Sequence, residues 1–376
     1  MAHSASQQDM GSGSVRKLLL KLAIPAVVGQ IVNLLYNIVD RIYIGHIPEV
    51  GAAALTGVGL FSPIVMLITA FAMMMGSGGA PLAAIAMGKN DKNRAETIMG
   101  NCFAMLLIFA LVLTPVFYVL APDMLRFFGA SDVTLPYAVA YGRIYILGSV
   151  FVLLVMGMGT FITTQGFAKI SMLTVVIGAV INIVLDPVFI FLFDLGVQGA
   201  ALATVLSQAV SAWWVLRFLT GKKTVLKLKK ENMRLLGKVV GPCFALGIST
   251  FVMLSTESIL SISFTTSLSR YGGDVAVGAM TILNSLNQLV TMPLMGICQG
   301  GQPIISYNFG ADNQKRVKEA FSTQFGLCVG YSFLFWIAMM AAPQFFAGIF
   351  TSDAALVEYA SWAIRIFLIC GFSVGF

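Results

Sequence analysis

The stretch GGAPLAAIAMG at residues 78–88 returns 222 positions later as GGQPIISYNFG at residues 300–310. The leading pair of glycines, the proline and the final glycine keep their register in both copies. At the same offset, Arg94 recurs as Arg316, Tyr137 as Tyr359 and Arg143 as Arg365. An internal repeat of this kind in an apolar chain is typical of transporters, because two half-bundles can rock against each other around a site between them.

The composition indicates a protein that lies in a membrane. Hydrophobic residues make up 58% of the chain and charged residues only 10%, whereas soluble domains carry about 25% charged residues. Apolar segments of about 20 residues are long enough to cross a bilayer as helices. We therefore predict an all-α integral membrane protein with two six-helix lobes. The predicted spans are 18–44, 53–77, 96–120, 135–159, 170–192, 199–219, 238–268, 276–300, 317–341 and 359–376.

Lysine and arginine gather in every second loop, most densely between residues 217 and 238. The opposite loops hold almost none, and Arg126 and Arg270 are the clear exceptions. The positive-inside rule then puts the N-terminus in the cytoplasm. We expect a multi-pass protein of the cytoplasmic (inner) membrane, and topology explains the net charge of +7 better than a nucleic-acid partner does. Six spans per repeat make this a parallel repeat.

The repeat also predicts the domain boundaries. We expect a disordered cytoplasmic N-terminus over residues 1–14 and a basic cytoplasmic linker over residues 221–237. The two lobes then occupy residues 15–220 (spans 1 to 6) and 238–376 (spans 7 to 10). Span 10 copies span 4, so copies of spans 5 and 6 would complete a twelve-span fold. We expect the sequence to be a truncated form or a fragment of such a protein, and we expect a monomer.

Three carboxylates lie inside predicted spans beyond their first turn, namely Asp40, Asp186 and Glu257. An acid at the bilayer centre costs about 2.5–3.5 kcal/mol on insertion scales, so it is either functional or part of a structural ion pair. Arg41 could pair with Asp40, but adjacent residues of a helix point to different sides. We favour function for Asp40 and Asp186 and leave both explanations open for Glu257.

The depth of these residues predicts one shared site in the first repeat. Spans 1 and 5 enter from the cytoplasm, which places Asp40 and Asp186 in the outer half of the membrane. Spans 4 and 6 enter from outside, which places Tyr141 and Thr204 in the same layer. Asn182 shares a helix face with Asp186 at a spacing of four residues. Carboxylate, amide and hydroxyl oxygens suit a proton or a small hard cation. We expect a coupling ion and no other cofactor or metal, with Na⁺ held by Asp40, Asn182, Asp186 and Thr204 if it is the ion.

A polar stripe on span 1 is formed by Gln30, Asn33 and Asn37, which lead to Asp40 at spacings of three, four and three residues. A polar stripe in a membrane helix faces protein or a water-filled cavity. Side-chain amides also join helices by hydrogen bonds, and for Asn33 and Asn37 the two explanations are equally good.

The second repeat carries an uncharged stripe on span 8. It comprises Asn284, Asn287, Gln288 and Thr291, and Glu257 is the only acid that lies beyond the first turn of a predicted span in this repeat. These side chains could contact substrate or bond a neighbouring helix, and we slightly favour a cavity lining. Histidine occurs only as His3 and His46, and neither an HExxH nor a GxSxG motif is present, so we do not expect an enzyme.

Three stretches resemble the multidrug and toxic compound extrusion (MATE) family. They are LAIPAVVGQIVNLLYNIVDRIYIGH (22–46), INIVLDPVFIFLFDLGVQGAALATVLSQ (181–208) and PIISYNFGADNQKRVKEA (303–320). The resemblance runs from about residue 15 to the end of the chain. It implies two six-helix lobes in a V and the exchange of an organic cation against H⁺ or Na⁺.

The resemblance also implies roles for particular residues. Prokaryotic members of the DinF-like branch use an Asp of helix 1, a Tyr of helix 4, an Asn and an Asp of helix 5 and a Thr of helix 6 as a cation site. Those positions are Asp40, Tyr141, Asn182, Asp186 and Thr204 here. Glu257 is similar to the helix-7 acid of the NorM branch. That branch also uses an acid in helix 10, and the predicted span 10 has none.

Together these observations predict a cation-coupled antiporter that exports organic cations or drugs by alternating access. A flippase or exporter of lipid-linked sugars or another amphipathic metabolite is the alternative, because fold does not fix substrate. Such a flippase would place Arg or Lys in the central cavity to meet phosphates. Only Arg143 and Arg365 are candidates for that role, and both lie near the outer ends of their spans.

Overall fold

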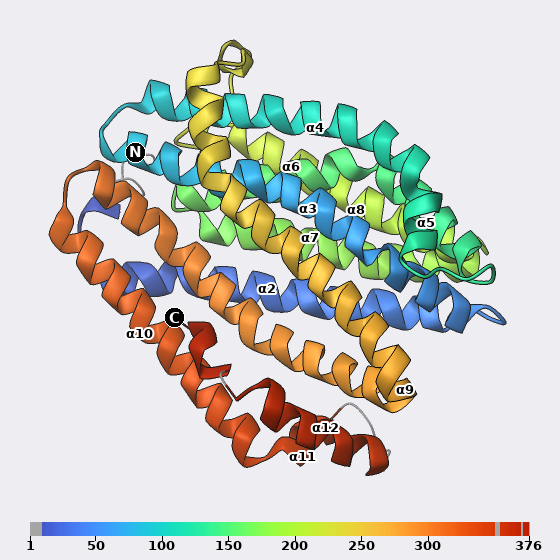
Figure 1. The fold of residues 1–376 in the computed structure, drawn as a ribbon. Coiled ribbons are helices and arrows are strands. Elements are labelled where there is room, and N and C mark those ends of the chain that lie inside the picture. Colours follow the sequence, from blue (N-terminus) through green and yellow to red (C-terminus); the bar gives the residue numbers. More distant parts are fainter. Residues whose placement is uncertain (1–9, 350–353, 370, 376) are drawn as a thin grey trace.

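The fold is known from a computed structural model that describes residues 10–349, 354–369 and 371–375. Within these residues the chain forms helices and no strands, so the predicted all-α class is confirmed. We call α2 to α8 the first lobe and α9 to α12 the second lobe (Figure 1).

The first lobe holds the long apolar helices that the predicted spans 1 to 6 require. They are α2 (Val15–Gly45), α3 (Gly51–Gly88), α4 (Lys92–Phe127), α5 (Leu135–Leu147), α6 (Ser149–Thr164), α7 (Ala168–Pro187) and α8 (Gly196–Leu219), with a π-helical turn, η1 (Val188–Leu192), between the last two. Span 4 is broken into α5 and α6, which meet at an angle of 56°. Gly148 lies at the break, where a Cβ would collide with the side chain of Val205.

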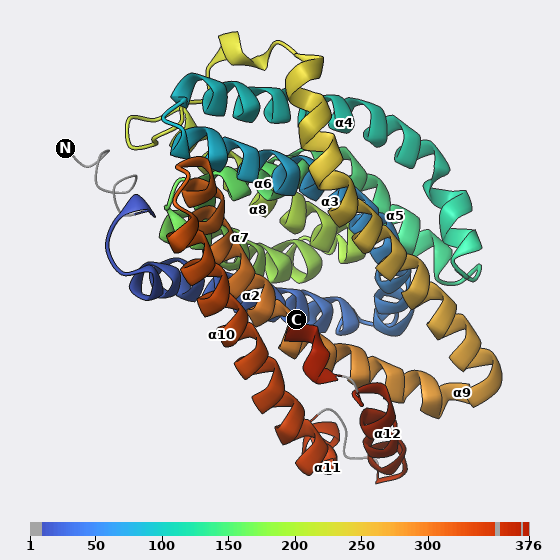
Figure 2. The ribbon, with the colours of Figure 1, turned by 60° about the vertical axis from the view of Figure 1, so that its left-hand side comes forward.

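The second lobe begins with the longest helix, α9 (Gly237–Gly310), which follows a short 3₁₀ turn, η2 (Lys230–Met233). Figures 1 and 2 show α9 turning back on itself, so it has a first arm (Gly237–Glu257) and a second arm (residues 279–310). The rest comprises α10 (Gln314–Ala341), α11 (Pro343–Gly348), α12 (Ala354–Phe367) and the 3₁₀ turn η3 (Gly371–Gly375).

Ten membrane spans were predicted, and most of them correspond to long apolar helices among the described residues. Seven helices are long and apolar enough to cross a membrane, or eight if α5 and α6 count as one broken span. The predicted spans 276–300 and 359–376 are not among them. The first is the second arm of α9. The second is replaced by α12, which has 14 residues, fewer than the roughly 20 that cross a bilayer. After α12 the chain folds back onto α10, where Trp336 Nε1 donates to the Leu368 carbonyl at 2.9 Å.

One end of the molecule carries most of the basic residues, and we call it the basic end. It comprises the start of α2, the α3–α4 and α9–α10 turns and the linker between the lobes. Here the lobes meet through pairs of glycines. A Cβ on Gly88 would collide with the Tyr307 carbonyl of the second lobe, and a Cβ on Gly310 would collide with the Ile85 carbonyl of the first. At the other end α5 and α12 lie far apart in both views (Figures 1 and 2).

We predicted that residues 1–14 are disordered, but part of this segment packs against the second lobe. Residues 1–9 lie outside the described residues, but residues 10–13 are held against the second lobe. Arg316 donates to the carbonyls of Gly13 at 2.7 Å, Ser12 at 3.1 Å and Met10 at 3.2 Å. Asn308 Nδ2 also donates to the Met10 carbonyl at 2.9 Å. These hydrogen bonds hold residues 10–13 in place, and the Met10 side chain is buried as well. Both contributions order the segment.

The basic linker is fastened to the first lobe by buried polar side chains. Gln165 Oε1 accepts hydrogen bonds from the backbone N–H groups of Val225 and Leu226, at 2.9 and 2.7 Å. The Glu96 carboxylate accepts from the Lys227 N–H at 3.1 Å and lies 2.6 Å from Lys229 Nζ. Both Gln165 and Glu96 are buried, at 0% and 1% exposure. The linker therefore packs as part of the first lobe and not as a free tether.

Candidate functional site

The five residues predicted to form a cation site lie together in the first lobe. Asp40 comes from α2, Tyr141 from α5, Asn182 and Asp186 from α7 and Thr204 from α8. All five are buried, and Asp40 is the most exposed at 9%. We call this cluster the carboxylate pocket.

Asn182 connects the polar groups of the carboxylate pocket. Its Nδ2 donates to Asp186 Oδ1 at 3.2 Å and to Thr204 Oγ1 at 3.3 Å. The Tyr141 side chain lies close to Thr204. These bonds fix the positions of one carboxylate oxygen and one hydroxyl before any ion arrives.

The carboxyl groups of Asp40 and Asp186 are neighbours in the pocket and interact with each other. Both are acceptors when ionised, so a shared proton or a cation is needed to hold them together. Among the described residues, no donor reaches three buried oxygens of the pocket, which are Asp40 Oδ1, Asn182 Oδ1 and Asp186 Oδ2. Buried acceptors without donors are rare in folded proteins, and three in one pocket fit a site that takes up a positively charged species.

Local sequence explains how α7 presents its two site residues. Asn182 and Asp186 are one helical turn apart and share a face. Pro187 follows directly and lacks the N–H that would continue the helical ladder. The chain then widens into the π turn η1 (Val188–Leu192). Wide turns of this kind occur frequently at functional sites, and this one places Asp186 at the end of a regular helix.

Aromatic residues that sequence reasoning missed enclose the pocket. Tyr36 of α2 is half-buried and shares a helix face with Asp40. Tyr141 and Tyr145 stack with ring centroids 6.0 Å apart, and a phenylalanine of α3, Phe61, packs edge-on against both. The signal was present in the chain, because Tyr36 precedes Asp40 by four residues and Tyr145 follows Tyr141 by four, so each pair shares a helix face.

The predicted stripe on α2 divides in the structure. Gln30 and Asn33 line a cavity between the carboxylate pocket and the basic end. Asn37 does not line this cavity, since it is exposed and donates to the Asn33 carbonyl at 2.6 Å. The side chain that continues the cavity lining is Tyr36.

The second-lobe candidates lie on α9, away from the carboxylate pocket. Glu257 and Gln288 are exposed, and Asn284 and Asn287 are half-buried. The Asn287 carbonyl accepts a hydrogen bond from Thr291 at 3.0 Å, within the same helix. These residues form no carboxylate pair like that of Asp40 and Asp186 within the part of the chain that the structure describes.

The donor set of the carboxylate pocket consists of oxygen atoms, which suit a proton or a small hard cation. In the described residues, no three His, Cys, Asp or Glu side chains are grouped as metal ligands. The carboxylate pocket instead offers two carboxylates together with amide and hydroxyl oxygens. Oxygen ligands suit a hard cation such as Na⁺, and the same pair of acids can share a proton.

Comparisons with known proteins agree with the fold. A family model described as MatE matches residues 25–188 and 249–376. Multidrug export protein MepA of Staphylococcus aureus (strain N315) is 27% identical over 362 residues, which cover 94% of this chain and 77% of that protein. MepA of Staphylococcus saprophyticus is 24% identical over 353 residues, again covering 94% and 77%.

Solved structures show the same architecture. One is described as an outward-facing multidrug resistance MATE transporter of the MOP superfamily, and it matches with a TM-score of 0.89 at 24% identity, covering 98% of this chain and 81% of that one. A MOP superfamily transporter from Pyrococcus furiosus matches with a TM-score of 0.88 at 23% identity, covering 98% and 84%. The family match spans most of the chain, the relatives cover nearly all of it, and the helices superpose on those of known transporters. The chain is therefore a multi-pass membrane protein that belongs to the MATE family.

Proposed function

We propose that this chain exports organic cations across the cytoplasmic membrane in exchange for H⁺ or Na⁺. The observation that carries the proposal is the carboxylate pocket, where Asp40 and Asp186 are buried neighbours and three buried acceptor oxygens have no donor among the described residues. The staphylococcal relatives are named as multidrug export proteins, which supports the substrate class.

Burial makes the charge of this pocket depend on a bound ion. Removing one carboxylate from water costs several kcal/mol unless a partner compensates it, and a second carboxylate beside it adds repulsion. A proton or Na⁺ between Asp40 and Asp186 relieves both costs. The pocket therefore binds one ion strongly in the geometry that brings these two acids together.

Ion binding is coupled to transport if the distance between Asp40 and Asp186 differs between the two conformations of the protein. An ion shifts a conformational equilibrium only through its different affinity for the two states. Asp40 belongs to α2 and Asp186 to α7, so a small movement of α2 changes the distance between the acids. Because α2 also packs against the second arm of α9, the ion-bound state of the pocket is coupled to the position of the second lobe.

The direction of transport rests on the charge distribution. Lysine and arginine are concentrated at the basic end, and the positive-inside rule puts this end in the cytoplasm. The lobes are in contact at the basic end, and α5 and α12 lie far apart at the other end in both views. We infer an arrangement that is closed to the cytoplasm and open to the outside.

The flippase alternative lacks an observation in its favour. A flippase for phosphate-bearing lipids needs a cation in its cavity. Arg143 is exposed, and its guanidinium lies 5.4 Å above the ring of Tyr118 in a cation–π contact within the first lobe. The carboxylate pocket itself is acidic, which favours a positively charged species.

Reconstituted vesicles provide the test. A fluorescent organic cation such as ethidium is loaded, and its transport is followed under separate pH and Na⁺ gradients. We expect the wild-type protein to respond to one gradient and Asp40→Asn to lose that response while still inserting and folding. The matched control is Asp123→Asn, because Asp123 is an exposed acid of α4. Coupled transport by Asp40→Asn at the wild-type rate would falsify the proposal.

A further inference from the structure

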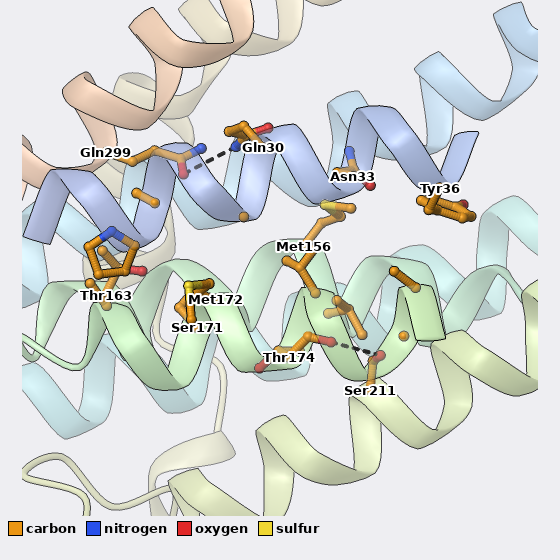
Figure 3. A pocket seen from close by; sticks show the side chains of 18 of the residues that line it. Gln30, Asn33, Tyr36, Met156, Thr163, Ser171, Met172, Thr174, Ser211 and Gln299 are labelled. Atoms are coloured by element: carbon orange, nitrogen blue, oxygen red, sulfur yellow. Dashed lines mark hydrogen bonds between the residues drawn. The ribbon is translucent and has the colours of Figure 1, made fainter. Parts of the chain in front are cut away.

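A cavity of about 120 Å³ lies in the first lobe between the carboxylate pocket and the basic end (Figure 3). Its lining comes from α2, α6, α7 and α8, with one residue from the second lobe. The lining includes the polar side chains of Gln30, Asn33, Ser171, Thr174 and Gln208. The cavity has room for several water molecules, and polar cavities of this size retain water.

The helix faces that bear the carboxylate pocket continue into this cavity. On α7, Gly178 lines the cavity and lies one turn before Asn182 of the pocket. On α8, Thr204 belongs to the pocket and Gln208, one turn later, lines the cavity. The α7 and α8 surfaces that hold the ion site therefore run on towards the basic end.

Tyr36 is the point where the two spaces meet. It lines the cavity, and Asp40 of the carboxylate pocket follows it by one helical turn on α2. Within the described residues, Oε1 of the cavity residue Gln208 is buried and has no donor. A buried acceptor of this kind next to a polar cavity is suited to bind water or a hydrated cation.

A side chain from the second lobe covers the cavity. Gln30 Nε2 donates to Oε1 of Gln299 at 3.3 Å, and Figure 3 shows the two amides facing each other across the boundary between the lobes. Gly296 and Gly300 lie on either side of Gln299 and allow α9 to approach α2 closely. A Cβ on Gly296 would lie 2.7 Å from the backbone of Val27. Close packing of the two helices thus holds Gln299 over the cavity.

We propose that this cavity is the route by which the coupling ion leaves the carboxylate pocket for the cytoplasm, and that Gln299 is its plug. The inference rests on the proposed function. When the lobes part at the basic end, α9 moves away from α2, the Gln30–Gln299 contact breaks and the cavity opens. The ion then leaves through the first lobe, and it cannot cross while the plug is in place. The site would take a proton on a chain of waters or a hydrated Na⁺.

Ion leak through reconstituted protein in the absence of organic cation tests the plug. Proton entry is followed with a trapped pH-sensitive dye and Na⁺ entry with radiolabelled sodium, in separate arms. We expect Gln299→Ala to raise the leak of one of these ions several-fold. Gln299→Asn, which keeps an amide but shortens it by one methylene, should leak as well and serves as a variant that folds more readily. Gln302→Ala should stay at the wild-type level, because Gln302 is exposed on the same helix and does not line the cavity.

The double variant Asp40→Asn/Gln299→Ala separates this inference from the proposed function. If the route passes through the carboxylate pocket, the double variant loses the leak that Gln299→Ala alone shows. A leak that persists without Asp40, or wild-type tightness of both Gln299 variants, overturns the route. Coupled transport by Asp40→Asn alone would instead overturn the ion site, whatever the Gln299 variants do.

Discussion

Gly88 of the first lobe and Gly310 of the second make the same contact in opposite directions. Gly88 lies against the carbonyl of Tyr307, and Gly310 lies against the carbonyl of Ile85. The offset of 222 residues converts one contact into the other. A two-fold relation of this kind joins lobes of the same orientation, as expected for a parallel repeat. The absence of a side chain at both glycines lets the backbones touch and closes the basic end.

We predict that Gly88→Ala and Gly310→Ala both open the basic end. Each new Cβ would collide with a backbone carbonyl, which cannot move aside as a flexible side chain can, so each costs about 1–3 kcal/mol in the closed state. Spin labels at Lys92 and Lys315, in a background without the five native cysteines, should report longer distances between the lobes in both variants.

The control for this measurement is Gly326→Ala on α10. A Cβ at Gly326 would meet no atom within 4 Å, so the distance between the labels should match that of the parent protein. Unchanged distances in Gly88→Ala and Gly310→Ala would show that the glycine contacts do not hold the lobes together.

Thr204→Val should weaken ion binding without disturbing the fold. Valine has nearly the shape of threonine but lacks the hydroxyl that accepts a hydrogen bond from Asn182. Losing one such hydrogen bond costs about 1 kcal/mol. The H⁺ or Na⁺ concentration at half-maximal transport should therefore rise about fivefold. Thr204→Ser restores the hydroxyl and should restore the affinity. Equal affinities for the Val and Ser variants would exclude a role for the hydroxyl.

Glu96→Gln should loosen the linker between the lobes. The substitution keeps an acceptor for the Lys227 N–H but removes the charge that faces Lys229. In inside-out vesicles, trypsin should cleave the linker several-fold faster than in the wild type. Glu231→Gln is the control, because Glu231 is exposed on the same segment. If both variants are cleaved at the wild-type rate, Glu96 does not fasten the linker.

The Glu96–Lys229 contact also predicts how the linker responds to pH. The hydrogen bond and the negative charge of Glu96 raise the pKa of Lys229 above its ordinary value. A raised lysine pKa stabilises the packed linker at all lower pH values, and the stabilisation is lost only as the pH rises through the shifted pKa. The trypsin cleavage rate of the linker is measured for the wild type and for Glu96→Gln at each pH. The ratio of the two rates should stay constant between neutral and mildly alkaline pH. A steep change of this ratio in that range would contradict the assignment.

Arg316→Gln should release the N-terminal segment from the second lobe. The guanidinium donates to three backbone carbonyls of residues 10–13, and a glutamine cannot reach all three. Hydrogen exchange of a peptide that covers residues 10–14 should become faster. Arg94→Gln is the matched control, since Arg94 is the equivalent residue of the first lobe and its side chain is exposed. The same exchange rate in both variants would show that the segment is held by other contacts.

The sequence by itself determined the class of the fold and the residue types of the site. Apolar segments and sparse charge require membrane helices, and the 222-residue repeat requires two similar lobes. Helical periodicity put Asn182 and Asp186 on one face, because residues four apart in a helix are neighbours whatever surrounds it. Acids in an apolar span are costly, which singled out Asp40 and Asp186 before their positions were known.

Only the tertiary structure decided which helix faces meet. Periodicity fixes the order of side chains around one helix but not how that helix is rotated against its neighbours. Asn37 and Tyr36 are equally good continuations of the stripe that begins at Asn33, and the packing of α2 turned Tyr36 towards the cavity and Asn37 away from it. The contact of Gln30 with Gln299 spans 269 residues and has no trace in local spacing. It exists because glycines on α9 let two helices from different lobes approach closely, and close packing is a property of the assembled chain.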